Sequence, residues 1–223
     1  MKFRRKSAET EATVDPTADR PFDEAAAAVV DEADASVAGP RDIDDLEDDD
    51  LEDGERVDLG SLVLTAVDGL EIRLQVDEST EQVQSVLHAG AEGAVELRAF
   101  AAPRNGDLWA EVRPRIAAEF AQRGGTASER EGRYGTELDC QITVRTEDGR
   151  TATQPSRVVG INGPRWMLRA TFLGRPAVEP DAEGPWDAAI EATVVRRGAQ
   201  AMPAGAELPL TLPPRDRLIR RQA

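Results

Sequence analysis

Strict alternation of apolar and polar residues in several separate stretches most limits how this chain can fold. In "RWMLRATFLG" every second residue from Trp166 to Phe172 is apolar. The same period of two recurs in "EIRLQV" and in "ELDCQITVR". A period of two places alternate side chains on opposite faces of an extended strand. Such strands predict an antiparallel sheet with one face on the core and one face in polar surroundings.

Turn signals separate these stretches from one another. Asp68–Gly69 and Asn162–Gly163 are favoured hairpin dipeptides, and Asp148–Gly149 supplies a further turn. We therefore expect "VDLGSLVLTAVDGLEIRLQVD" to form a strand, a hairpin turn and a second strand. Further strands are expected in "VQSVLHAG", "GAVELRAFAAP" and "SRVVGI", and a last edge segment in "LPLTLP".

Two stretches have helical spacing instead. In "GDLWAEVRPRIAAEFAQRGG" an apolar stripe at helical spacing follows Asp107, a good N-cap, although Pro114 inside it removes one backbone donor. A second helix is expected in "GPWDAAIEATVVRRG", with Pro185 near its first position. Runs of strands between single helices predict an α+β fold, a mainly antiparallel sheet packed by two helices in a layered sandwich.

The acidity of the chain is concentrated near its beginning. Residues 1–58 hold 20 Asp and Glu against 7 Lys and Arg, whereas residues 59–223 hold 23 against 20. The early part also has few large apolar side chains, so it cannot bury enough surface to offset the entropy of ordering. We expect a disordered acidic leader over residues 1–56, an α+β domain over 57–199, and an extended C-terminal segment with a short basic tail over 200–223.

The residues that usually carry catalysis are scarce. His88 is the only histidine, no G-x-S-x-G occurs, and Cys140 lies on the apolar face of its strand. No His/Cys cluster for zinc, no P-loop and no G-x-G-x-x-G is present, and the acidic run does not have the EF-hand order. The sequence therefore predicts no enzyme activity, no cofactor and no dedicated metal site.

Several arginines occupy strand positions opposite the apolar residues. These candidate ligand-binding residues are Arg73, Arg98, Arg145, Arg165 and Arg169. On neighbouring strands they would form a basic face for an anionic ligand or for the chain's own acidic leader. The alternative is an ordinary strand surface, on which they pair with Glu71, Glu96, Glu137 and Asp139. The near balance of charge in residues 59–223 favours the alternative.

Charge and hydropathy also bear on location and partners. The basic start "MKFRRKSAETEA" has no apolar run after it, and "AAAAVV" is too short to cross a bilayer. We expect a cytoplasmic protein that does not associate with membranes. A formal net charge of −16 disfavours direct nucleic-acid binding while the leader is present, so the expected partner is a protein.

Three longer stretches of this chain resemble a known family. "RVDLGSL…VDGLEIRLQVD", "LRAFAAPRNGDLWAEVR…IAAEF" and "VVGINGPRWMLRATFLGRPA" are similar to the actinobacterial family catalogued as domain of unknown function 3710. The resemblance runs from about Arg56 to Leu212 and implies no activity, cofactor or site residues. Members often lie near genes for dUTPase and OB-fold proteins, which links them to nucleotide housekeeping by association only. The order of strands and helices also resembles the PsbP-like sandwich.

Three functions remain open at this point. The first is a protein-interaction or accessory module without catalytic machinery. The second is a protein or enzyme that binds a small anionic ligand through strand arginines. The third is an accessory protein of nucleic-acid or nucleotide metabolism. A pocket with converging arginines would favour the second, and a shallow apolar patch would favour the first.

Overall fold

Two β-sheets, both rich in antiparallel pairs, form the framework of the protein. They are seen in a computed structural model that describes residues 39–47, 56–77, 79, 82–104, 106–145, 149–181 and 184–212. The predicted α+β class with mainly antiparallel strands and few helices is confirmed. The expected disorder of the leader concerns mostly residues 1–38 and 48–55, which lie outside the described residues.

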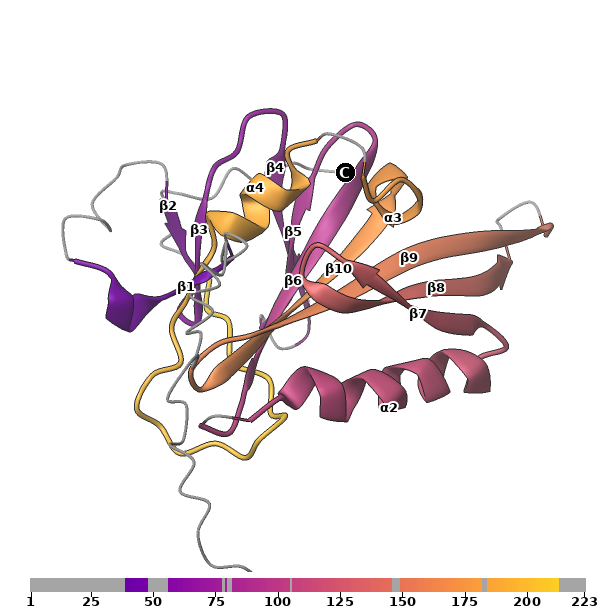
Figure 1. Cartoon of the computed structure of the whole chain (residues 1–223). Helices are drawn as coiled ribbons and strands as arrows, with labels where there is room; N and C mark the ends of the chain where they lie inside the picture. Colours follow the sequence, from indigo (N-terminus) through magenta and orange to yellow (C-terminus); the bar gives the residue numbers. More distant parts are fainter. Residues whose placement is uncertain are drawn as a thin grey trace, which may run out of the picture. The chain divides into compact units, whose positions relative to one another are not determined.

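The larger sheet has seven strands in the order β4-β5-β6-β10-β9-β8-β7, and all its neighbours are antiparallel (Figure 1). Its strands are β4 (Glu71–Val76), β5 (Val83–Ala89), β6 (Gly93–Ala101), β7 (Thr126–Gly132), β8 (Gly135–Arg145), β9 (Thr151–Asn162) and β10 (Trp166–Gly174). All except β7 coincide with predicted strands. The sequence of β7, "TASEREG", has no apolar alternation because this edge strand lies largely in polar surroundings.

The smaller sheet has four strands in the order β1-β11-β3-β2. They are β1 (Arg41–Asp42), β11 (Val194–Val195), β3 (Leu62–Thr65) and β2 (Arg56–Asp58). The pair of β1 and β11 is parallel, and the other pairs are antiparallel. The predicted hairpin at Asp68–Gly69 is wrong. The turn does form, but β3 before it and β4 after it belong to different sheets and do not pair.

The predicted C-terminal helix is shorter than expected. Helix α4 spans only Trp186–Glu191, and the valines that follow form β11. Both valines are fully buried and pair with β3 on one side and β1 on the other. Because β-branched side chains pack well on a pleated surface, sheet pairing prevails over the helical spacing here. A short helix, α3 (Arg175–Val178), follows β10 and was not predicted.

Part of the segment assigned to the leader contributes to the fold. Residues 39–47 include β1 and a turn of 3-10 helix, η1 (Ile43–Asp45). Asp42 is 7% exposed, and its side chain accepts a hydrogen bond from the backbone of Asp44. Residues 39–47 thus take part in the fold, although the sequence assigned them to the leader.

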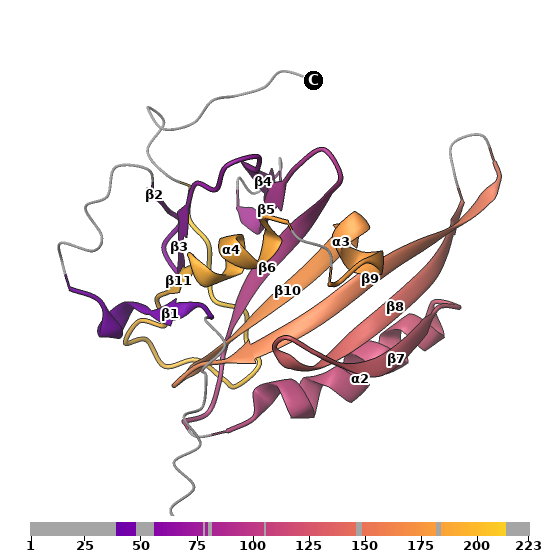
Figure 2. The same ribbon diagram turned by 45° about the horizontal axis from the view of Figure 1, so that its top comes forward.

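Helix α2 (Leu108–Gln122) agrees with its prediction. Asp107 caps its first turn, since Asp107 Oδ1 accepts a hydrogen bond of 2.9 Å from the Ala110 backbone. Pro114 lies inside the helix, which continues on both sides of it. The helix packs on the end of the larger sheet formed by β7, β8 and β9 (Figure 2). Its buried side chains share a cluster with Leu138, Cys140 and Met167.

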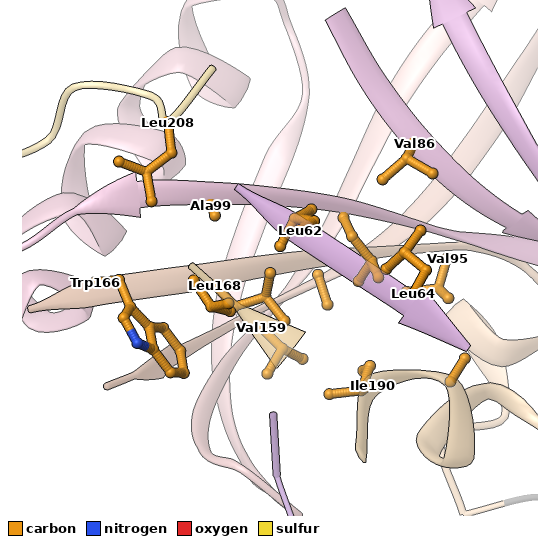
Figure 3. Packing of buried hydrophobic residues seen from close by; sticks show 14 of the residues in the cluster. Leu62, Leu64, Val86, Val95, Ala99, Val159, Trp166, Leu168, Ile190 and Leu208 are labelled. Carbon is orange, nitrogen blue, oxygen red and sulfur yellow. The ribbon is translucent and has the colours of Figure 1, made fainter. Parts of the chain in front are cut away.

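The main core lies between the two sheets. Leu62 and Leu64 of β3 belong to one buried cluster with Val95 of β6 and Leu168 of β10 (Figure 3). The alternation that opens the sequence analysis holds, because the four apolar residues of β10 on this face are at most 2% exposed. The expected last edge segment also forms, since Leu208 is buried and donates its N–H to the Ala99 carbonyl at 2.8 Å.

Among the described residues, no helix has the length and apolar character needed to cross a membrane.

Candidate binding cleft

Carboxylates of this chain already contact several of the strand arginines. Arg73 Nη2 lies 3.1 Å from Glu71 Oε2. Arg98 Nε lies 3.4 Å from Glu96 Oε1 and 3.3 Å from Glu207 Oε1. Glu71 and Glu96, two of the four carboxylates expected as partners, thus contact strand arginines, each from two residues away on the same strand. Partly exposed pairs of this kind contribute little stability, as is typical of a strand surface.

Two of the five candidate arginines stand side by side. Arg98 of β6 is the direct register partner of Arg169 of β10. The Arg169 guanidinium carbon lies 5.0 Å from the centroid of the Phe100 ring. Burial, with the neighbouring charge of Arg98, lowers the pKa of Arg169 below its ordinary value. This pair is the part of the predicted arginine face that the structure brings together.

The other candidate arginines lie elsewhere. Arg145 is the last residue of β8 and is exposed, with Thr151 as its register partner. Arg165 precedes β10, and its Nη2 lies 3.8 Å from Asp44 Oδ2. Asp44 belongs to the segment assigned to the acidic leader, so one strand arginine does face a leader carboxylate. Ligand binding by the five arginines stays a prediction.

A cleft of about 400 Å³ lies elsewhere on the surface. It opens between the start of α2, the turn from β7 to β8, and the end of β9. Its lining residues are Gly39, Asp107, Trp109, Arg113, Arg133, Tyr134, Gly135, Thr136, Gly160, Ile161 and Asn162. The volume falls in the range of small-molecule sites. None of the five predicted arginines lines it.

A hydrogen-bond network fixes one wall of the cleft. Asn162 Nδ2 donates to Asp107 Oδ1 at 2.8 Å, and Asn162 Oδ1 accepts from the Trp109 backbone at 3.3 Å. Asn162 thereby joins the end of β9 to the start of α2. Because Asp107 also caps the helix, its carboxylate is held at the cleft by both elements.

Trp109 packs closely on the sheet beside the cleft. A Cβ atom on Gly160 would lie 2.2 Å from the Trp109 ring, so only glycine allows this approach. The indole Nε1 donates to the Thr136 carbonyl at 2.6 Å, and the residue is 4% exposed. The indole is thus a fixed part of the wall with little surface left for a ligand.

Arg113 projects from α2 into the cleft lining. Its Nε donates to Glu129 Oε1 of β7 at 2.8 Å, and its guanidinium carbon lies 5.9 Å from the centroid of the Trp109 ring. We find no partner for its two terminal nitrogens among the described residues. These nitrogens are donors that an anionic group can use.

Arg133 and Tyr134 form the opposite side, in the turn between β7 and β8. Arg133 Nη2 pairs with Glu191, and its Nη1 lies 3.8 Å from Asp187 Oδ2. The Tyr134 hydroxyl donates to Asp187 Oδ1 at 3.1 Å. Burial, together with the Asp187 charge, raises the pKa of Tyr134, so its hydroxyl stays protonated. Two carboxylates of α4 thus hold this side of the cleft.

The residues first considered for catalysis lie outside the cleft. His88 is fully buried, neither ring nitrogen has a hydrogen-bond partner among the described residues, and burial lowers its pKa to about 4. Burial, with the charge of Asp139, raises the pKa of Cys140 to about 11, and its thiol is buried. Over the described part of the chain, no group of three or more His, Cys, Asp or Glu side chains is arranged to hold a metal ion.

Sequence reasoning noted several cleft residues without assigning them to a site. The sequence predicts Asp107 as a helix cap and Asn162 as part of a turn. Arg113 and Arg133 were not singled out, because a helix and an unpredicted turn supply them. The dipeptide Tyr134–Gly135 is the one signal available, since Gly135 has a φ of 89° and marks the turn.

The fold and the cleft together define an α+β protein with two antiparallel-rich sheets and a cleft whose lining has charges of both signs. The family model for proteins of unknown function DUF3710 matches residues 39–217. The chain therefore belongs to the DUF3710 family, as its resemblance indicated. Among curated proteins, none matches the chain.

Proposed function

We propose that this chain is a binding protein that holds a small molecule by its anionic group in the cleft at the start of α2. The observation that carries the proposal is the presence of two arginines, Arg113 and Arg133, in the lining of one cleft of about 400 Å³. Guanidinium groups bind carboxylates and phosphates through several directed hydrogen bonds. Binding of a small anionic ligand is the second of the three functions considered above, but Arg113 and Arg133 here replace the strand arginines as the binding residues.

The support lies in how the two arginines are held. Glu129 fixes Arg113 from β7, and Asp187 with Glu191 fixes Arg133 from the region of α4. A side chain that is already positioned loses less conformational entropy when a ligand binds. The Arg98 and Arg169 pair has a weaker case, because neither arginine lines this cleft.

Titration calorimetry on the full chain tests the proposal. The probes are inorganic phosphate, citrate, hexanoate and 6-aminohexanoate at low ionic strength, where charge interactions are least screened. We expect at least one probe to bind with a stoichiometry of one. The Arg113→Gln and Arg133→Gln variants should each weaken that binding by about tenfold, the loss of one charge-assisted hydrogen bond.

Matched controls come from the strand arginines. Arg73→Gln removes an arginine that pairs with Glu71 on the exposed sheet surface. The affinity of this variant for the probe should equal that of the unmodified chain. Arg98→Gln and Arg169→Gln test the competing location. A loss confined to the last two variants, or no binding of any probe, would refute the proposed cleft.

We further propose a cytoplasmic location and a protein partner for the same chain. The support is the formal net charge of −16, which favours solubility and disfavours anionic surfaces. Co-purification from cell extract with the full chain and with a chain lacking residues 1–38 tests the partner. Recovery of no common protein by both chains would contradict a partner bound by the folded domain.

A further inference from the structure

We infer that the ligand of this cleft is a zwitterion, with an ammonium group near Asp107 and a carboxylate near Arg113 and Arg133. The inference rests on the proposed function and adds the chemical class of the ligand. It follows from the charges on and around the cleft, which are not of one sign.

The first argument is an available carboxylate oxygen in the lining. Asp107 Oδ1 already accepts hydrogen bonds from the Ala110 backbone and from Asn162 Nδ2. We find no partner for Asp107 Oδ2 in the described part of the chain. A carboxylate held this firmly, with one oxygen unused, suits an ammonium group, which brings three donors.

The second argument is the balance of charge. Two guanidiniums line the cleft, but Asp107 also lines it, and Glu129, Asp187 and Glu191 contact the arginines from outside. Four carboxylates therefore surround two cations. A ligand with only negative charge would gain from the arginines and lose to the carboxylates, whereas an added ammonium group turns that repulsion into attraction.

A purely cationic ligand does not fit the same surroundings. A cation would pair with Asp107, but it would also face Arg113 and Arg133, two like charges in the same lining. A ligand with both charges can pair with Asp107 and with the two arginines of the lining.

The spacing of Asp107 and Arg113 guides the length of the probes. Asp107, the N-cap of α2, and Arg113 are six residues apart, and a helical rise of 1.5 Å per residue separates their backbones by about 9 Å along the axis. On this backbone separation we choose probes with charges at the two ends of a six-carbon chain in place of an α-amino acid.

Three probes of equal chain length test the inference: 6-aminohexanoate, hexanoate and hexylammonium. Each is titrated into the full chain at one ionic strength. We expect 6-aminohexanoate to bind about tenfold more tightly than either single-charge probe, since one further charge-assisted hydrogen bond is made. Equal affinity for hexanoate and 6-aminohexanoate would overturn the inference.

The Asp107→Asn variant identifies the residue responsible. Asparagine is as good an N-cap as aspartate, so α2 is expected to keep its start. Affinity for 6-aminohexanoate should fall to that for hexanoate, and affinity for hexanoate should not fall. The matched control is Asp44→Asn, which removes a carboxylate 74% exposed and outside the cleft lining, and it should change neither affinity.

The outcomes separate this inference from the proposed function. If hexanoate binds through Arg113 and Arg133 and the amino group adds nothing, the cleft is an anion site and only the zwitterion is rejected. If phosphate, citrate and the three six-carbon probes all fail to bind, the proposed function itself is rejected together with the zwitterion.

Discussion

The indole Nε1 of Trp166 donates a hydrogen bond of 2.6 Å to Asp42 Oδ2, although 124 residues separate the two in the sequence. Both residues are buried, at 2% and 7% exposure. A tryptophan on the core face of β10 thus has its one polar atom satisfied by a carboxylate of the small edge strand β1. Buried indole N–H groups usually require such a partner.

Replacing Asp42 should therefore destabilise the whole domain. In Asp42→Ala the buried indole N–H loses its acceptor, which costs about 1–3 kcal/mol in the free energy of unfolding. Asp42→Asn keeps an oxygen and should cost less. Urea denaturation measures both values. Asp44→Ala, two residues away and exposed, is the control, and an equal loss there would show that the bond to Trp166 is unimportant.

Burial of His88 makes stability depend on pH in a defined window. Its pKa is lowered from 6.5 to about 4 in the folded chain. As pH falls below 6.5 the unfolded chain takes up a proton that the folded chain does not, so folding stability decreases with falling pH. The loss is about 1.4 kcal/mol per pH unit and reaches about 3 kcal/mol near pH 4.

The His88→Leu variant isolates this effect from the titration of carboxylates. Its free energy of unfolding should change less between pH 7 and pH 4 than that of the unmodified chain, by about 3 kcal/mol. Denaturant titrations of both chains at several pH values provide the comparison. Parallel pH profiles would mean that His88 is not buried as a neutral ring.

Cys140 should be almost unreactive while the chain is folded. With a pKa raised to about 11, roughly one thiol in a thousand is ionised at pH 8, and the side chain is buried as well. A disulfide reagent should modify the folded chain orders of magnitude more slowly than it modifies the same chain in guanidinium. Labelling of the folded chain at the rate of free glutathione would contradict this expectation.

A buried ion pair under α3 should be among the most sensitive points of the fold. Arg157 Nη1 lies 2.9 Å from Glu137 Oε2, Arg157 also donates to the Pro176 carbonyl, and both charged side chains are at most 5% exposed. Replacing Glu137 with Gln leaves the buried guanidinium without its counterion and should cost about 3–5 kcal/mol in the free energy of unfolding.

Two comparisons show whether burial is the cause. Glu71→Gln affects an exposed pair with Arg73 and should change stability by no more than about 0.5 kcal/mol. The double variant Glu137→Leu with Arg157→Met removes both charges and should cost less than Glu137→Leu alone. Similar losses for the exposed and the buried pair would contradict the account.

Much of the larger sheet was predictable, because burial of one face leaves a period of two in the sequence. The alternation in β8 and β10 and the stripe of α2 all coincide with observed elements. The edge strand β7 was not predictable in this way. Its charged residues pair at the surface, for example Glu129 with Arg113, so no apolar face marks it.

The division into two sheets was also hidden from the sequence. Asp68–Gly69 is followed by a strand and preceded by a strand, which is the pattern of a hairpin, yet β4 pairs with β5 and β3 pairs with β11. A turn signal fixes the local direction of the chain but not which strand becomes its neighbour. Likewise, the spacing of Val194 and Val195 fits a helix, and their β-branched side chains fit a strand. Their pairing with β3 and β1 determines that they form a strand.

The cleft could be predicted least of all. Arg113 comes from a helix and Arg133 from the turn after an edge strand, and no sequence spacing relates them. The strand arginines were easier to identify, since alternation alone assigns them to one face. The alternation says nothing about the carboxylates that reach them, such as Glu207 beside Arg98, which belongs to a distant segment.

Strand β1 has a consequence for how far the chain can be shortened. A chain that begins at Val57 would lack Asp42, and β11 would lose one of its two neighbours. Val194 and Val195 would then present unpaired backbone groups at a new apolar edge, a template for association with other chains. The smallest well-behaved domain should therefore start at about Gly39, which is also where the family match begins.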